Sequence, residues 1–232
     1  MRRSLSRFFI LLSVICMTAL CVSPSLASEA KDRYIKVVGV EGKVLTLDVD
    51  GRPVRIPLPE GYEVMREEEY PEAYRHAVAR EKKIDSILLS LLVDAKEAQK
   101  KRSDTTNTHK VITLRISNIH IDERYNLNTY QNEKDEIKRM TDDGNKWANS
   151  ELQKKNRSPF SVNPIFEDIK SICFLEIEDY VNQGNYRLGL TKSYILFEDI
   201  VITVVFQKNI QSTAEVDSLV KDTINYMKLI GR

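Results

Sequence analysis

Three consecutive apolar segments near the C-terminus constrain the fold of this chain more than any other feature. They are residues 171–181, 186–197 and 200–208, and all three are rich in β-branched and aromatic side chains. Turn signals separate them, at Gln183-Gly184-Asn185 and around Glu198-Asp199. Short turns join antiparallel neighbours, whereas parallel strands need a crossover of a dozen residues or more. These segments therefore predict a three-stranded antiparallel meander.

A second group of strands is predicted at residues 34–58. Glu41-Gly42 separates the first two strands, and Asp50-Gly51 connects the second to the third. Asp-Gly between alternating apolar residues is a strong hairpin signal, because both turn positions need a positive φ. Pro53 and Pro57 lack the N–H that a sheet ladder requires. The third strand is therefore expected at a sheet edge, with pairing ended by the prolines and Gly61 turning the chain.

A short helix and two more strands are predicted in the middle of the chain. Residues 66–83 carry acidic side chains early, Pro71 at a first-turn position and basic side chains late, as a helix dipole favours. The expected apolar stripe of this helix consists of Tyr70, Tyr74, Ala77 and Val78. The continuously apolar residues 86–94 predict a buried strand, and the alternating residues 110–118 predict another.

Two further helices complete the pattern. A long one begins near Asn128, with Tyr130, Ile137, Met140, Gly144 and Trp147 three, four or seven residues apart and Leu152 five residues later, enough for one buried face. Gly144 lowers helix propensity and could break this helix in two. The last helix opens at Ser212, which has capping-box spacing to Glu215.

This order of elements indicates an α+β fold in which helices pack on an antiparallel sheet. The stretch "IPLPEGYEV", the helix after it and the strand "SILLSLLV" resemble a loose group of small exported bacterial proteins. The long helix near residue 128, the meander and the terminal helix resemble the PsbP/Mog-type α/β sandwich. The resemblance covers residues 50–230, and the N-terminal β-hairpin precedes it. It implies a fold whose members are mostly binding or accessory proteins. A fold of this kind also hosts unrelated functions, so the resemblance bears on fold more than on function.

The N-terminus predicts export. Arg2, Arg3 and Arg7 precede an apolar run, and Ser25-Leu26-Ala27 supplies the small residues that a signal peptidase reads. We expect a signal peptide at residues 1–27, cleavage after Ala27 and a periplasmic or secreted protein, with 28–232 as one domain (34–58 strands, 59–232 main body). A retained membrane anchor and a lipoprotein cleaved before Cys21 are the alternatives.

Cleavage would change both the charge and the cysteine content. The remaining 205 residues would carry 32 basic and 34 acidic side chains, a net charge of −2, which gives no case for nucleic-acid binding. Cys173 would be the single cysteine, so no internal disulfide is expected. We expect a buried thiol, with an intermolecular bond as the alternative.

No catalytic, cofactor-binding or metal-binding motif is recognisable in the sequence. The three histidines, His76, His109 and His120, lie outside the known catalytic patterns. His120 and Asp122 share one face of an extended segment and could form half of a metal site, although a solvated strand end is the expected structure. Asp142 and Asp143 are expected to be solvated acids on a helix face, because their surroundings lack the register of a calcium loop.

Two surface regions are candidates for interactions. Tyr62, Tyr70 and Tyr74 could form a partner or ligand surface if they are exposed, or they could cover the edge of the core. The basic segment Lys96–Arg102 could contact an anionic membrane, or it could be a solvated loop.

These features favour a noncatalytic exported accessory or binding protein of the bacterial envelope, with an envelope protein partner or a small ligand and no cofactor. The first alternative is an extracytoplasmic hydrolase whose carboxylates converge only in the folded chain. An immunity-type partner of a secreted effector is a weaker alternative.

Overall fold

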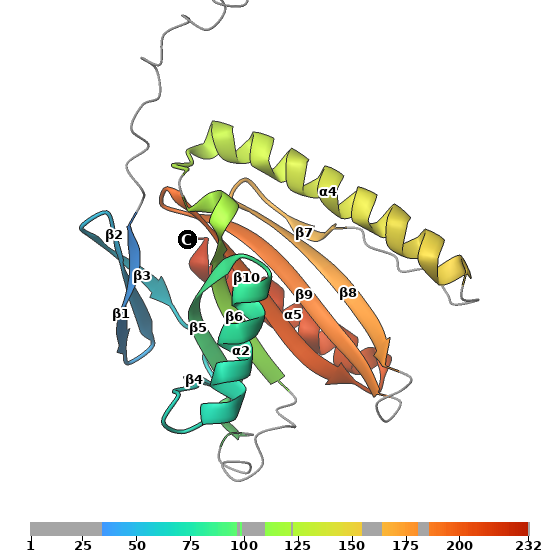
Figure 1. Ribbon diagram of the computed structural model, residues 1–232, viewed down its shortest axis with the longest axis horizontal. Coiled ribbons are helices and arrows are strands. Elements are labelled where there is room, and N and C mark those ends of the chain that lie inside the picture. The colour runs from blue at the N-terminus through green and yellow to red at the C-terminus, as the bar shows by residue number, and fades with distance from the viewer. Residues whose placement is uncertain are drawn as a thin grey trace, which may run out of the picture. The chain divides into compact units, whose positions relative to one another are not determined.

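Two antiparallel sheets make up the framework of the protein (Figure 1). The computed structural model describes residues 34–96, 98, 110–121, 123–154, 164–180 and 186–231. The smaller sheet has the order β1-β2-β3, and the larger has the order β4-β5-β6-β10-β9-β8-β7. With helices packed on these sheets, the fold is α+β as predicted. The proposed signal peptide lies outside the described residues.

The smaller sheet is the predicted group of N-terminal strands. It contains β1 (Ile35–Glu41), β2 (Val44–Val49) and β3 (Arg52–Pro57). Asp50 and Gly51 have φ values of 55° and 80°, which confirms the hairpin turn expected there. The strand β3 is an edge strand and ends at Pro57, which confirms the effect predicted for the prolines.

The stretch after Pro57 carries the chain from the smaller sheet to the larger one. Gly61 turns with a φ of 78°, and β4 (Tyr62–Val64) then pairs with β5 (Ser86–Asp94). Residues 54–64 therefore end one strand and begin an edge strand of the next sheet.

The larger sheet contains the predicted meander. Its strands β8 (Ser171–Tyr180), β9 (Tyr186–Phe197) and β10 (Ile200–Ile210) are antiparallel neighbours, and β6 (Lys110–Ser117) pairs with β10 on the other side. The turn expected around Glu198 is confirmed, whereas the one at 183–185 lies outside the described residues. The short edge strand β7 (Pro164–Glu167) was not predicted.

Helices cover both faces of the larger sheet. On one face α2 (Pro71–Lys83) and α4 (Leu127–Lys154) lie over the strands, and on the other lies α5 (Thr213–Ile230) (Figure 1). The helix α4 continues through Gly144, so the break considered there does not occur. Met140, which was expected on the inner face of this helix, is exposed. Among the described residues, none of the helices has the length and apolar character to cross a membrane.

The predicted cap of α5 is present. The backbone N–H of Ser212 donates to the Glu215 carboxylate at 3.2 Å, which satisfies one donor at the start of the helix. Further along, the hydroxyls of Thr191 on β9 and Thr223 on α5 are 2.6 Å apart in the buried contact between strand and helix.

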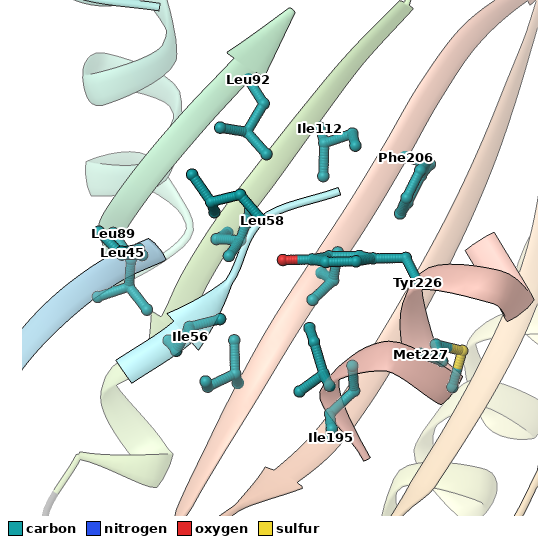
Figure 2. Packing of buried hydrophobic residues seen from close by; sticks show 14 of the residues in the cluster. Leu45, Ile56, Leu58, Leu89, Leu92, Ile112, Ile195, Phe206, Tyr226 and Met227 are labelled. Atoms are coloured by element: carbon teal, nitrogen blue, oxygen red, sulfur yellow. The ribbon is translucent and has the colours of Figure 1, made fainter. Parts of the chain in front are cut away.

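The main hydrophobic core fills the space between the smaller sheet, the larger sheet and α5. Figure 2 shows side chains from β2, β3, β5 and β6 converging with those of β9, β10 and α5. Tyr226 of α5 lies at the centre, where its ring meets Phe206 edge-on at 5.9 Å. Its hydroxyl donates to the Pro57 carbonyl oxygen at 3.0 Å, which ties α5 to the end of β3.

We expect Gly189→Ala to destabilise the protein by about 1–3 kcal/mol, because a methyl group there would overpack the core. A Cβ at residue 189 would lie 2.7 Å from Ile210 Cγ1 and 3.0 Å from Leu219 Cδ2. Gly144→Ala is the matched control, since a Cβ there meets nothing within 4 Å and should stabilise α4 by about 1 kcal/mol. Urea denaturation measures both changes, and equal effects of the two substitutions would contradict this packing.

Candidate functional site

The face of the larger sheet between α2 and α4 carries polar side chains at its centre. Because side chains alternate along a strand, Ile112 and Leu114 of β6 enter the main core while Thr113 and Arg115 point to the opposite face. On that face the register places Thr203 of β10 beside Arg115 on one side and Tyr194 of β9 on the other.

A groove of about 430 Å³ opens over this polar row, and we call it the α2–α4 groove. Its floor includes Arg115, Lys192 and Thr203, and its wall includes His120 and Glu133. The lining residues that are open to solvent, which we call its rim, are the apolar Ile84, Ile119 and Met140. These three rim side chains are among the large hydrophobic residues most open to solvent, with about half of each exposed. The groove therefore combines a charged floor with an exposed apolar rim.

His120 lies inside the protein and not at a solvated strand end, so that expectation was wrong. It ends the short 3₁₀ helix η1 (Asn118–His120) and is 2% exposed. Its ring centre lies 5.8 Å from that of Tyr125 and 6.4 Å from that of Tyr194, edge-on to both. Its Nε2 lies 2.8 Å from Glu133 Oε1 on α4. His109 and Asp122 lie outside the described residues, within which no three potential metal ligands come together.

A buried carboxylate fixes one side of the groove floor. Glu81 of α2 is 1% exposed, and its Oε2 accepts hydrogen bonds from Arg115 Nη1 at 2.8 Å and from the Ser86 hydroxyl at 2.7 Å. Arg80 binds the other oxygen, with Nη2 3.1 Å from Oε1. Burial acts to raise the pKa of Glu81, but the hydrogen bonds from Ser86 and Arg115 outweigh it, and the pKa is lowered.

Glu81 was not identified from the sequence as a site residue, although its position in the helix pattern indicated burial. It follows Ala77 by four residues on the buried side of α2, where an acid is unusual. Val78, which was expected in the apolar stripe, is exposed instead. The inner face of α2 therefore runs from Tyr70 through Ala77 to Glu81, and its polar end lies beside the groove.

Lys192 supplies the second cation of the floor. Its Nζ lies 5.0 Å from the centre of the Tyr194 ring, which places the ammonium group over an aromatic face. Within the described part of the chain, no carboxylate forms an ion pair with it. A half-buried ammonium group without a carboxylate partner is therefore open to an incoming anion.

The three tyrosines proposed as an interaction surface do not form an exposed cluster. Tyr62 is buried against Phe206, with their ring centres 6.2 Å apart. Tyr70 is 1% exposed, and its hydroxyl donates to Glu63 at 3.3 Å, while Tyr74 is half-buried on α2. The correction has a simple cause: β4 and α2 turn these rings into the edge of the core, which was the alternative weighed for them.

The other singled-out residues have structural surroundings. Cys173 is buried, which raises the pKa of its thiol to about 12, although a hydrogen bond from Ser193 acts in the opposite direction. Asp142 and Asp143 are exposed on α4 and pair with Lys146 and Arg139, as expected of helix-face acids. His76 and Lys96 are exposed, and the other basic residues of that segment, Lys100–Arg102, lie outside the described residues.

Comparisons with known proteins identify no family for this chain. No protein-family model matches it, and no curated protein matches its sequence. Two solved structures resemble its fold: a mutant of the protein Mog1, with 9% identity and a TM-score of 0.35, and the Saccharomyces cerevisiae Ran-binding protein Mog1p, with 7% identity and a TM-score of 0.34. Each likeness covers 85% of this chain and 93% of the other. These scores are too low to bear on function.

We expect Glu81→Gln to lower the free energy of unfolding by about 3 kcal/mol near neutral pH, because it leaves the partly buried Arg115 charge without its carboxylate partner. The lowered pKa of Glu81 means that the carboxylate stabilises the fold above its ordinary pKa of 4.5 and that this stability is lost as the pH falls below that value. The difference between wild type and variant should therefore shrink on acidification from pH 7 to 3.

The matched control is Glu136→Gln on the exposed face of α4, where the carboxylate pairs with Arg139 in solvent. Urea denaturation across this pH range should show little change for the control. A constant difference between wild type and Glu81→Gln at all pH values would contradict the role given to the Glu81 charge.

Proposed function

We propose that this is a noncatalytic binding protein of the bacterial envelope that holds its ligand in the α2–α4 groove. The observation that carries the proposal is the groove itself, in which an exposed apolar rim surrounds a floor with two cationic side chains, Arg115 and Lys192. Its volume of about 430 Å³ lies within the range of small-molecule sites. Exposed apolar side chains that gather at one cavity are typical of binding sites.

The envelope part of the proposal rests on the N-terminal sequence. Arg2, Arg3 and Arg7, the apolar run after them and Ser25-Leu26-Ala27 together form the pattern of a signal peptide. We therefore propose cleavage after Ala27 and a location in the periplasm or outside the cell.

The chemistry of the groove supports binding more than catalysis. Hydrolysis by two carboxylates needs a pair of acids that face the same substrate, and the described lining contributes one, Glu133. Cys173 lies on the other face of the sheet, in the main core, so its thiol does not face the groove. The described lining therefore has the groups that binding requires but lacks the second acid that hydrolysis by two carboxylates requires.

An extracytoplasmic hydrolase is the second candidate function, because His120 and Glu133 form a hydrogen-bonded pair at the groove wall. Such a pair could act as a general base. If the wild type hydrolyses activated esters and His120→Gln does not, the hydrolase candidate is favoured. If the wild type hydrolyses none, the binding proposal is favoured.

Photo-cross-linking in cells tests the proposed site. We expect a photoreactive benzoylphenylalanine in place of Ile119 to trap a ligand, which intact-protein mass spectrometry would detect as a discrete mass increase. Ile169 provides the matched control, since it is exposed to a similar degree, 65% against 62%, but does not line the groove. An adduct at residue 169 and none at residue 119 would refute the groove as the binding site.

A further inference from the structure

The groove floor has an excess of positive charge. Arg115 and Lys192 contribute two cations to the described lining, and the single carboxylate there, Glu133, already binds His120. Arg115 is partly neutralised by Glu81, whereas Lys192 forms no ion pair with any described carboxylate. Hydrogen bonds to charged groups are stronger than those between neutral ones. The Lys192 ammonium group is therefore the group on this floor that can bind an anionic ligand.

The register brings the two cations within reach of one small group. Arg115 and Tyr194 lie on opposite sides of Thr203, one strand away in each direction, and Lys192 is two residues from Tyr194 on the same face. With about 4.8 Å between strands and about 3.4 Å per residue along a strand, the backbones of Arg115 and Lys192 are roughly 12 Å apart. Lysine and arginine side chains are long enough for their charged ends to approach each other across that gap.

The rim supplies a different kind of contact. Ile84, Ile119 and Met140 surround the opening with exposed aliphatic and thioether groups, and Ile137 extends this apolar surface into the groove. Covering such side chains with a hydrocarbon chain removes apolar area from water, which is favourable in proportion to the area. A ligand that satisfies both regions has a charged end and an apolar end.

The size of the groove limits the ligand. A volume of about 430 Å³ is near the lower end of the range for small-molecule sites, about 300–1,000 Å³. This space suits a single short chain better than a lipid with two chains.

We propose that the ligand of the α2–α4 groove is an oxyanion, a carboxylate or a phosphate, attached to a single apolar chain. The headgroup lies between Lys192 and Arg115, and the chain lies against Ile84, Ile119 and Met140. This inference rests on the proposed function of the groove as a binding site. Arginine and lysine side chains bind both carboxylates and phosphates. The structure therefore does not separate the two headgroups, and the experiment below compares them directly.

The test is isothermal titration calorimetry of the full chain with decanoate, decyl phosphate and 1-decanol, each below its aggregation concentration. We expect at least one of the two anions to bind ten-fold or more tightly than the alcohol, because the headgroup adds charge-assisted hydrogen bonds. The tighter anion identifies the headgroup. Added salt should weaken binding of the anions and leave that of 1-decanol nearly unchanged.

The variant that isolates the headgroup is Lys192→Met, which keeps much of the side-chain length and removes the charge. We expect roughly ten-fold weaker binding of the preferred anion and unchanged binding of 1-decanol. Lys221→Met is the matched control, because Lys221 is exposed on α5, across the sheet from the groove. The Lys221→Met variant should bind all three probes with the affinities of the wild type.

Equal affinity for all three probes, or an equal loss of all three in Lys192→Met, would overturn the headgroup inference and leave the groove as a binding site. Failure of all three to bind would also overturn the ligand class. The adduct at residue 119 reports separately on the groove, so the two proposals can fail independently. The salt dependence is measured on the wild-type chain and does not depend on the folding of a variant.

Discussion

The alternation of side chains along β6, β9 and β10 is the constraint on which the rest of this structure depends. Every second residue of β6 and β10 within the sheet is apolar and enters the main core between the two sheets and α5, and the alternate residues of β9, including Thr191, Ser193 and Ile195, face the same way. The residues between them, including Thr113, Arg115, Lys192 and Thr203, must then point to the opposite face. The helices α2 and α4 cover only the flanks of that face, so its polar centre becomes the floor of a groove.

The Glu81–Arg115 ion pair fixes the positions of the charged side chains on this polar face. An isolated carboxylate at 1% exposure would be strongly destabilising, but the guanidinium groups of Arg115 and Arg80 and the hydroxyl of Ser86 surround it. The network joins the end of α2 to β5 and β6 and thereby holds Arg115 at the groove. A stabilising interaction of the fold thus also positions a residue of the proposed binding site.

Local patterns predicted much of the fold and little of the site. The meander, the Asp50-Gly51 hairpin and the cap at Ser212 depend on neighbouring residues, and all three are confirmed. The burial of Glu81 and His120 depends instead on partners from distant segments, Arg115 and Glu133. The strand β7 is short and gains its place only by pairing with β8, so its own four residues carry too weak a signal.

The central claim is that this protein binds its ligand in the α2–α4 groove. Methyl-resolved NMR tests it most directly, on the full-length protein with labelled isoleucine and methionine, titrated with a small-molecule extract of the bacterial envelope. We expect the methyl signals of Ile84, Ile119 and Met140 to shift together, while those of Ile112 and Ile202 in the main core stay in place. Shifts confined to methyl groups outside the groove would contradict the claim.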